Sequence, residues 1–453
     1  MSRVIFGSSV KNSPVTSSTV HFGLVVSGMT IQSQARRAKT LALPFMIALS
    51  ACVQEVDTPG MSRPAYSIIF DQAQPQWARA ELSLPCSDGA HTLFSRAPAM
   101  HLESQIEDVR CDDVTIEPVG LNWVLPADCK TANWRISLET AEPGAVRPSR
   151  QRSLVLDDGW AVISGPTSLL RVAGFDAQTL AITLTTAEGT KASTVAPLHA
   201  APSFYVLGDP PSVEHESQSA SLTYIADDLE AIEALVDPAL HHQAIKYMRE
   251  AIGSAQSSQV EDLTVIWFGA ERSRAEVSGA AGFDTLIANY VLASDSPTPL
   301  EAAAPFVLVL HEHFHQLAIG ATPHWVSESL ANYYAIKAAR RILPDDPGVE
   351  AARAMFINPD ALVPTGMLEL QRRIDEDGDR SGYMQFYSAG ATFWAQIDDA
   401  LTQATDSVQT LDDVLPVILA ADYSPNDGLP DTVIEALAAI PEERRAALFD
   451  QYL

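Results

Sequence analysis

The sequence predicts a multidomain protein in which an antiparallel β-sandwich precedes an α+β domain and a mainly helical C-terminal region. Three observations predict it: a length of 453 residues, short strand-like runs up to about Leu207, and helical periodicity after Pro211. Hydrophobic residues make up 47% of the chain without a long purely apolar run, so the mature part should be soluble and globular. The formal net charge of −28 argues against nucleic acid as a partner, because phosphate binding needs clustered Lys and Arg.

Residues 1–52 have the pattern of an export signal and not of a folded element. Three basic residues precede the apolar run Leu41–Leu49, and Met29 is the predicted true start. The run ends in Leu-Ser-Ala-Cys at Cys52, which resembles a bacterial lipobox. The resemblance implies cleavage before Cys52, lipid attachment to its thiol, and a membrane anchor in the envelope of a Gram-negative-like bacterium. Val53 favours the outer membrane, facing the periplasm; an ordinary signal peptide with a chance cysteine is the alternative.

Residues 53–64 should be a tether behind the lipid. Export would place Cys86, Cys111 and Cys129 in an oxidising compartment, where one disulfide is plausible and one thiol is left over. The sequence does not decide which two cysteines pair. None has a second cysteine at zinc-ligand spacing, which argues against a cysteine metal site.

Residues 65–207 are predicted to form the β-sandwich domain. Short runs with alternating or continuous apolar residues are separated by turn residues, which is typical of antiparallel strands. The clearest runs are Tyr66–Phe70, Trp134–Leu138, Trp160–Ile163 and Leu180–Thr185. Pro210-Pro211 and the polar run Ser212–Ser221 mark the end of this domain.

Residues 208–343 are predicted to form the α+β core domain, and residues 344–453 a helical C-terminal region. Helical periodicity and apolar β-branched runs alternate in the first part of the core domain. The predicted helices are Asp227–Val236 and Pro238–Ile252, and the predicted strands are Leu263–Phe268 and Thr285–Leu292. From Pro299 to the end the pattern is mainly helical.

The motif H-E-x-x-H runs from His311 to His315. On a helix, positions i and i+4 lie on one face, so both imidazoles can bind one metal ion. Zinc lowers the pKa of a coordinated water to about 7, and the adjacent Glu312 can accept its proton. The extra histidine, His313, points away from this face and is expected on the surface or behind the ligands.

Local signals support a helix around this motif. Thr298 and Glu301 have the spacing of a capping box, Pro299 suits the first helical position, and Gly320 is a natural stop. Pro305 should kink the helix or delay its start.

A second helix, predicted from Thr322-Pro323, carries Glu328 as the candidate third metal ligand. Catalytic zinc usually takes three protein ligands and keeps one position open. Asn332 lies one turn later and either orients a ligand or is an ordinary surface amide.

Together, H-E-x-x-H and the later W-x-x-E-x-x-A-x-Y segment starting at Trp325 resemble the gluzincin zinc peptidases. The segment starting at Phe386-Tyr387 is similar to the Y-x-K-G-A segment of aminopeptidase N and glycyl aminopeptidase relatives. The resemblance implies a thermolysin-like α+β zinc peptidase domain after the β domain, with one Zn²⁺ per chain held by His311, His315 and Glu328. It also implies a peptide or protein substrate, Glu312 as general base, and Tyr387 as oxyanion stabiliser.

Three departures from the family pattern leave alternatives open. Ser329 stands where these families usually have Gly, and Ala389 replaces the usual Lys. No upstream segment supplies the carboxylate that grips a substrate amine, and Asp284 is the only acid near that place. Exopeptidase specificity is therefore doubtful, although the strand Thr285–Leu292 could hold a peptide by edge pairing. The alternatives are a non-catalytic envelope lipoprotein that keeps the zinc site for stability or partner binding, and a periplasmic binding or assembly protein without metal.

Overall fold

The computed structural model describes most of the chain from Ala65 to Leu453. The described ranges are 65–84, 90–100, 102–142, 144–156, 159–174, 179–186, 191–197, 204–217, 220–255, 257, 261–271, 277–292, 297–318, 322–360, 364–423 and 428–453. The predicted export signal, tether, Cys52, Cys86 and Gly320 lie outside these ranges. Within them, no helix combines the length and apolarity needed to cross a membrane.

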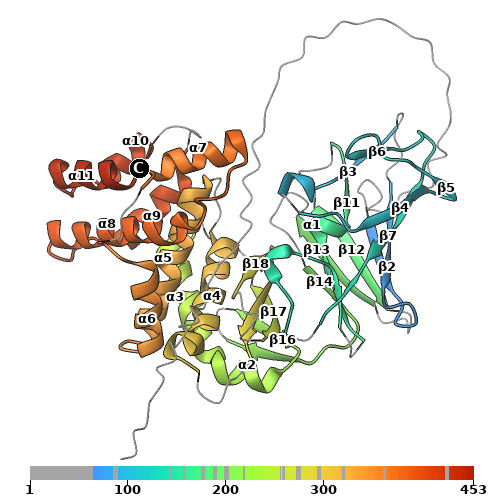
Figure 1. The fold of residues 1–453 in the computed structure, drawn as a ribbon, viewed down its shortest axis with the longest axis horizontal. Helices are drawn as coiled ribbons and strands as arrows, with labels where there is room; N and C mark the ends of the chain where they lie inside the picture. The colour runs from blue at the N-terminus through green and yellow to red at the C-terminus, as the bar shows by residue number, and fades with distance from the viewer. Residues whose placement is uncertain are drawn as a thin grey trace, which may run out of the picture.

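The N-terminal part consists of three β-sheets (blue to green in Figure 1). The seven-stranded sheet has the order β13 (Lys191–Pro197), β12 (Thr179–Thr186), β1 (Ala65–Phe70), β2 (Trp77–Ser83), β7 (Thr131–Ser137), β4 (Ile106–Cys111), β5 (Val114–Thr115). The four-stranded sheet has the order β14 (Phe204–Leu207), β10 (Ala161–Ser164), β9 (Leu154–Val155), β8 (Glu139–Thr140). The three-stranded sheet has the order β11 (Leu170–Val172), β3 (Thr92–Ser95), β6 (Asn122–Val124), and the short helices are η1 (Pro98–Met100), η2 (Pro148–Arg150) and α1 (Gly165–Ser168).

Most neighbouring strands in this part are antiparallel, as expected, but two pairs are parallel. β1 pairs with β12, and β8 pairs with β9, in parallel register. The expectation of a purely antiparallel sandwich is wrong at these pairs, because β12 returns beside β1 only after a long excursion of the chain.

A disulfide joins Cys111 to Cys129, which settles the pairing that the sequence left open.

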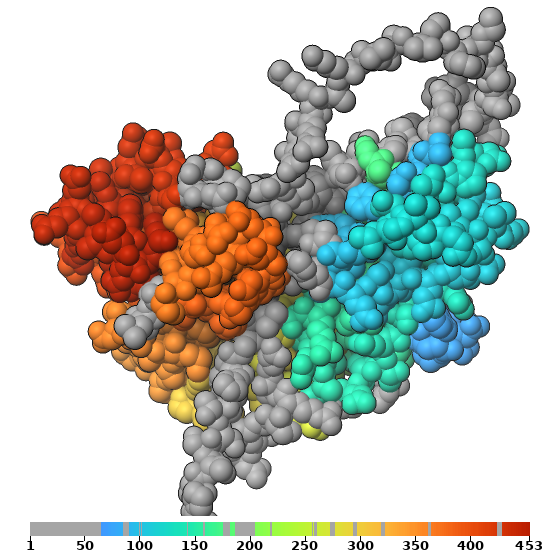
Figure 2. Space-filling view, turned by 45° about the horizontal axis from the view of Figure 1, so that its top comes forward, coloured from blue at the N-terminus to red at the C-terminus, as the bar shows by residue number. Residues whose placement is uncertain are grey.

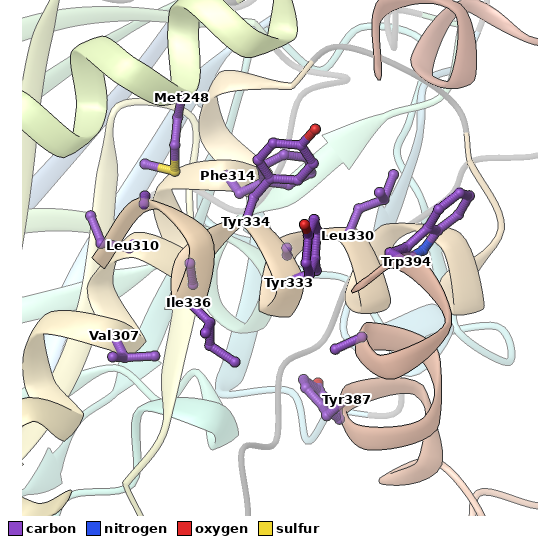
Figure 3. Close-up of a cluster of buried hydrophobic side chains, with 14 of the residues drawn as sticks. Met248, Val307, Leu310, Phe314, Leu330, Tyr333, Tyr334, Ile336, Tyr387 and Trp394 are labelled. Atoms are coloured by element: carbon purple, nitrogen blue, oxygen red, sulfur yellow. The ribbon is translucent and has the colours of Figure 1, made fainter. Parts of the chain in front are cut away.

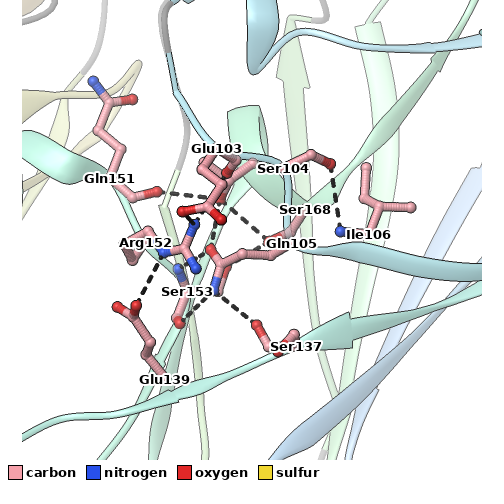
Figure 4. Close-up of polar contacts among 11 residues, drawn as sticks. Glu103, Ser104, Gln105, Ile106, Ser137, Glu139, Gln151, Arg152, Ser153 and Ser168 are labelled. Atoms are coloured by element: carbon pink, nitrogen blue, oxygen red, sulfur yellow. Dashed lines mark hydrogen bonds and ion pairs between the residues drawn. The ribbon is translucent and has the colours of Figure 1, made fainter. Parts of the chain in front are cut away.

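Gln105 holds the sheets of the N-terminal part together through a buried polar network (Figure 4). Its Nε2 donates to the carbonyl oxygens of Ser137 and Ser153 at 2.8 and 3.0 Å, and its Oε1 accepts from the Ser153 amide at 2.7 Å. These bonds satisfy polar groups that would be costly to bury alone.

A five-stranded sheet follows. Its order is β15 (Ser212–Glu216), β16 (Ser221–Ala226), β17 (Asp262–Ala270), β19 (Thr285–Val291), β18 (Gly279–Ala281). The three middle strands are parallel, and both outer strands are antiparallel to their neighbours. The expected edge strand, Thr285–Leu292, is therefore an interior strand, which agrees with its almost continuous burial. The edge nearest the helices is β18, whose Gly-Ala-Ala sequence has little strand propensity and gave no signal.

The remaining described elements are helices, as expected from Pro299 onward. They are α2 (Leu229–Leu235), α3 (Pro238–Ile252), α4 (Pro299–Leu317), α5 (His324–Ile342), α6 (Pro347–Phe356), α7 (Met367–Asp377), the π-helix η3 (Phe386–Gly390), α8 (Ala391–Ala404), α9 (Leu411–Ala420), α10 (Asp431–Ala436) and α11 (Glu442–Tyr452). One face of the five-stranded sheet packs on these helices in a single large core, part of which Figure 3 shows. The other face packs on the four-stranded sheet, where Trp160 stacks on Phe268 at 6.1 Å.

Helix α4 begins where the capping box predicts. The Thr298 amide donates to Glu301 Oε2 at 2.8 Å, and the Glu301 amide donates to Thr298 Oγ1 at 3.3 Å. Pro305 lies inside the helix and does not delay its start. The capping-box hydrogen bonds fix the first turn of the helix. The backbone N–H that Pro305 lacks would have donated inside the helix, after this first turn, so its absence does not affect where the helix begins.

Candidate metal centre

Helices α4 and α5 pack against each other and bring three potential ligands together, namely His311, His315 and Glu328. The Nε2 atoms of the two histidines lie 3.1 Å apart. Each lies 3.4 Å from Oε2 of Glu328. Two histidines one turn apart on α4 and one glutamate on α5 thus direct their ligand atoms to a single position.

This triangle of atoms fits a tetrahedral zinc ion. Zinc binds imidazole nitrogen and carboxylate oxygen at about 2.0–2.2 Å, which sets ligand atoms about 3.3–3.5 Å apart in a tetrahedral site. The observed separations of 3.1 to 3.4 Å agree with that spacing. Oε2 of Glu328 and Nδ1 of His311 are buried without a partner of strict hydrogen-bond geometry, so a bound cation would satisfy the carboxylate.

The site is enclosed on most sides. The side chains of His311 and Glu328 are fully buried, whereas that of His315 is 12% exposed. Solvent therefore has access to the site from the His315 side.

Burial and neighbouring charges set the protonation of the metal-free site. Burial lowers the pKa of His311 to about 4, with Glu328 opposing the shift, so the imidazole is neutral at pH 7. Burial alone would raise the pKa of Glu328, but His315 and His311 together lower it below its usual range. The site therefore presents a neutral imidazole and a carboxylate, which are the forms that bind zinc.

Polar neighbours hold the two imidazoles in place. Ser327 Oγ lies 3.2 Å from Nδ1 of His315. Asn332 favours the charged form of His311, and its Nδ2 donates to the Tyr387 carbonyl at 2.6 Å. Asn332 is 1% exposed, so it is not an ordinary surface amide. The other prediction for it, that it orients a ligand, is consistent with these contacts.

Glu312 lies on the same helix with its carboxylate against strand β18. Neither oxygen has a partner of strict hydrogen-bond geometry, although the Ala281 amide favours the ionised form. Burial raises the pKa of Glu312 well above its usual range, and the charge of Glu328 adds to the shift. A Cβ atom on Gly279 would lie 2.5 Å from Glu312 Oε1, so the carboxylate occupies space that only glycine leaves open.

Two tyrosines approach the ligands, and the sequence predicted only one. The ring of Tyr387 stacks on that of His311, with centroids 5.6 Å apart and an interplanar angle of 29°. Tyr383 donates from its hydroxyl to Glu328 Oε1 at 3.0 Å. The gluzincin-like motif identifies Tyr387 alone, and no sequence pattern marks Tyr383. Tyr387 lies in the π-helix η3, a type of irregularity that is frequent at functional sites.

Ser329, which stands where the gluzincin families usually have Gly, is held by hydrogen bonds through its hydroxyl. Its hydroxyl accepts from Trp394 Nε1 at 2.7 Å and donates to the Trp325 carbonyl. A Cβ atom on Gly390 would lie 2.4 Å from Ser329 Cβ. The serine is therefore accommodated by the glycine of the opposite segment.

His313 is not at the surface, and Asp284 lies away from the site. His313 is fully buried, with Nδ1 2.7 Å from Gln316 Oε1 and its ring 4.8 Å from that of His241. Of the two positions expected for His313, the surface is wrong because α4 is buried on nearly all sides, and a place behind the ligands remains. Asp284 lies in the turn between β18 and β19, close to Asp262, and not at the end of β18 that touches Glu312.

No protein-family model and no curated protein matches this chain in sequence. Solved structures match its fold. The crystal structure of an aminopeptidase N family protein from Idiomarina loihiensis aligns with a TM-score of 0.57 and 12% identity, covering 84% of this chain and 76% of that one. Legionella pneumophila aminopeptidase A in complex with aspartic acid aligns with a TM-score of 0.50 and 10% identity, covering 86% of this chain and 49% of that one. The chain thus has an aminopeptidase N-like fold, with β-sheets in the N-terminal part and helices in the C-terminal part.

Proposed function

We propose that this chain is a zinc-dependent peptidase of the gluzincin type, with one zinc ion held by His311, His315 and Glu328. The observation that carries the proposal is the triangle of donor atoms with edges of 3.1 to 3.4 Å, next to the buried carboxylate of Glu312. The aminopeptidase N-like fold supports it, since a β domain followed by a helical domain is the arrangement the gluzincin resemblance implies.

The roles of the residues follow from their positions. When bound, zinc would act as a Lewis acid on the scissile carbonyl and on the attacking water. Glu312 accepts a proton from that water and returns it to the leaving amine. The phenol of Tyr387, beside His311, donates to the oxyanion that develops on the carbonyl.

Strand β18 is the proposed binding edge for the substrate. It ends the five-stranded sheet among the described residues, and its Gly279 touches Glu312. An extended peptide could add to this edge with its backbone beside the general base. This edge replaces the Thr285–Leu292 strand as the proposed peptide-holding element.

The described residues offer no acid placed to grip a free amine at β18. Asp284, the candidate considered for that role, lies in the turn between β18 and β19, where its carboxylate accepts a hydrogen bond from Thr285 Oγ1 at 3.1 Å. Cleavage within peptides or proteins is therefore favoured over removal of single N-terminal residues.

We also propose that the protein is a lipoprotein anchored through Cys52 in the outer membrane, facing the periplasm. The lipobox-like sequence supports the anchor, and the Cys111–Cys129 disulfide fits an oxidising compartment. Mass spectrometry of the mature N-terminus tests this part separately, since an unmodified Cys52 would contradict it.

A peptide-library digest tests the peptidase proposal. The purified chain, loaded with zinc, should cleave a mixed peptide library, and a chelator should abolish cleavage until zinc is restored. The Glu312→Gln variant should bind zinc and leave the library intact. Bound zinc without cleavage by the wild-type chain would favour the non-catalytic lipoprotein, and absence of zinc binding would leave the binding or assembly protein.

A further inference from the structure

Aliphatic side chains are exposed on one segment of the N-terminal part, residues 114–124, here named the aliphatic loop. Four large hydrophobic side chains in the described part are more than half exposed, and three of them belong to this loop. The exposed fractions are 63% for Val114, 69% for Val119, 62% for Leu121 and 49% for Val124. Exposed apolar groups gathered in one place commonly mark a docking surface.

The strand register places the start of this loop at the end of the sheet where the chain enters. Ala65 pairs with Ser83, and Ser83 pairs with Thr131. The Asp112 amide, two residues before the loop, donates to the Thr131 carbonyl at 3.0 Å. Four strand spacings separate β1 from β5 in this sheet, which corresponds to about 19 Å. The beginning of β1 and the start of the aliphatic loop therefore share one end of the sheet.

The length of chain between Cys52 and Ala65 limits how far this end of the sheet can lie from a lipid on Cys52. Residues 53–64 connect Ala65 to Cys52, and an extended chain of that length reaches at most about 40 Å. A lipid on Cys52 would therefore keep the beginning of β1 within about 40 Å of the bilayer surface. Helices α4 and α5, which carry the metal centre, lie nearer the middle of the molecule beside β18 (Figure 1), and the cyan segment around the loop forms an outer end (Figures 1 and 2).

The charges beside the loop indicate how it would bind lipid. Asp112, Asp113 and Glu117 are exposed around it, and the whole chain carries a net charge of −28. Attraction to anionic lipid is therefore excluded as the driving force. Partly buried Trp123 and its aliphatic neighbours suit shallow insertion among headgroups and upper acyl chains.

We propose that the aliphatic loop is a membrane-docking surface that inserts into the bilayer to which Cys52 is anchored. The inference rests on the proposed lipid anchor, and it does not depend on peptidase activity.

Hydrogen exchange on vesicles tests the proposal. The lipidated full chain is reconstituted on zwitterionic phosphatidylethanolamine–phosphatidylcholine vesicles, and exchange in residues 114–124 is compared with that of a soluble Cys52→Ser form. Exchange should slow about tenfold or more on vesicles, a change that partial burial of two apolar side chains is large enough to produce. The Val119→Asn/Leu121→Asn double variant should lose this protection. The matched control Val408→Asn, at a site 80% exposed in the helical half, should keep it.

Two results would overturn the proposal. One is equal exchange of the loop on vesicles and in solution. The other is protection that needs no vesicles and grows with protein concentration, which would assign the loop to a contact between two copies of the chain. Peptide hydrolysis by the soluble form is measured in parallel, so that loss of docking and loss of the proposed activity are distinguished.

Discussion

The hydroxyl of Tyr383 donates a hydrogen bond to Oε1 of Glu328 at 3.0 Å, while Oε2 of the same carboxylate faces the two histidines. Burial raises the pKa of Tyr383 well above its usual range, with Glu328 adding to the shift, so the phenol remains a donor. The two oxygens of Glu328 thus have separate partners, and Tyr383 fixes which oxygen is turned toward the metal position.

Replacing Tyr383 with Phe should weaken zinc binding. The substitution removes the donor that orients Glu328, and losses of this kind usually lower metal affinity about 10- to 100-fold. Competition with a chelator of known affinity measures the change. An unchanged zinc affinity together with lost turnover would instead assign Tyr383 to the substrate.

Replacing Tyr387 with Phe should lower the catalytic rate and leave zinc binding unchanged. Its ring contacts His311 but its proposed donor role concerns only the oxyanion, so zinc affinity should stay the same. Removal of one oxyanion donor should lower kcat about 10²- to 10³-fold with little change in KM. Steady-state kinetics on a library-derived peptide checks this, and a parallel loss of zinc would count against the assignment.

The Glu312→Gln variant should keep one zinc ion per chain and lose about 10²- to 10⁴-fold in kcat, because the amide cannot accept the proton. Atomic absorption and peptide hydrolysis measure the two quantities on one sample. His311→Ala is the matched control, since it should lose both. Near-normal hydrolysis by Glu312→Gln would remove it as the general base.

Zinc should also stabilise the fold. The metal-free site buries Glu328 with only partial compensation, and a ligand present at a thousand times its Kd adds about 4 kcal/mol to the free energy of unfolding. Calorimetry should show a higher Tm with zinc and a lower Tm with chelator. Glu328→Gln should flatten this response, and an equally large shift in that variant would point to a different metal site.

Local patterns allowed the first part of the site to be predicted. The H-E-x-x-H spacing and the capping box at Thr298 act within one helix, so sequence alone predicts the helix and its two histidines. The β domain, strands β17 and β19 and the helical C-terminal part also follow from periodicity. Their pairings do not, because the parallel contact of β1 with β12 joins residues far apart in sequence.

Other features depend on packing that no local pattern records. Tyr383 meets Glu328 only because the segment before η3 folds onto α5, and β18 is too short and too poor in β-branched residues to give a strand signal. His313 looks like a surface residue until α3 covers it with His241. In each case the missing information is the tertiary neighbour.

The contact between Gly390 and Ser329 gives a prediction about the departure from the family pattern. A methyl group on Gly390 would approach Ser329 Cβ to 2.4 Å, so Gly390→Ala should cost about 1–3 kcal/mol of stability. It should also reduce kcat, because the same segment carries Tyr387. Ser329→Gly alone should cost about 1–3 kcal/mol, because the buried Trp394 Nε1 loses its acceptor.

The double variant Ser329→Gly/Gly390→Ala decides whether these two residues form one packing unit. Removing the serine side chain removes the clash, so the alanine should cost less in the double variant than in the wild-type background. Denaturant unfolding of the four proteins gives the coupling free energy, which should lie between about 0.5 and 3 kcal/mol for residues in direct contact. Additive costs would mean that the segment carrying Tyr387 shifts independently of α5, and the serine would then have no packing role in placing that tyrosine.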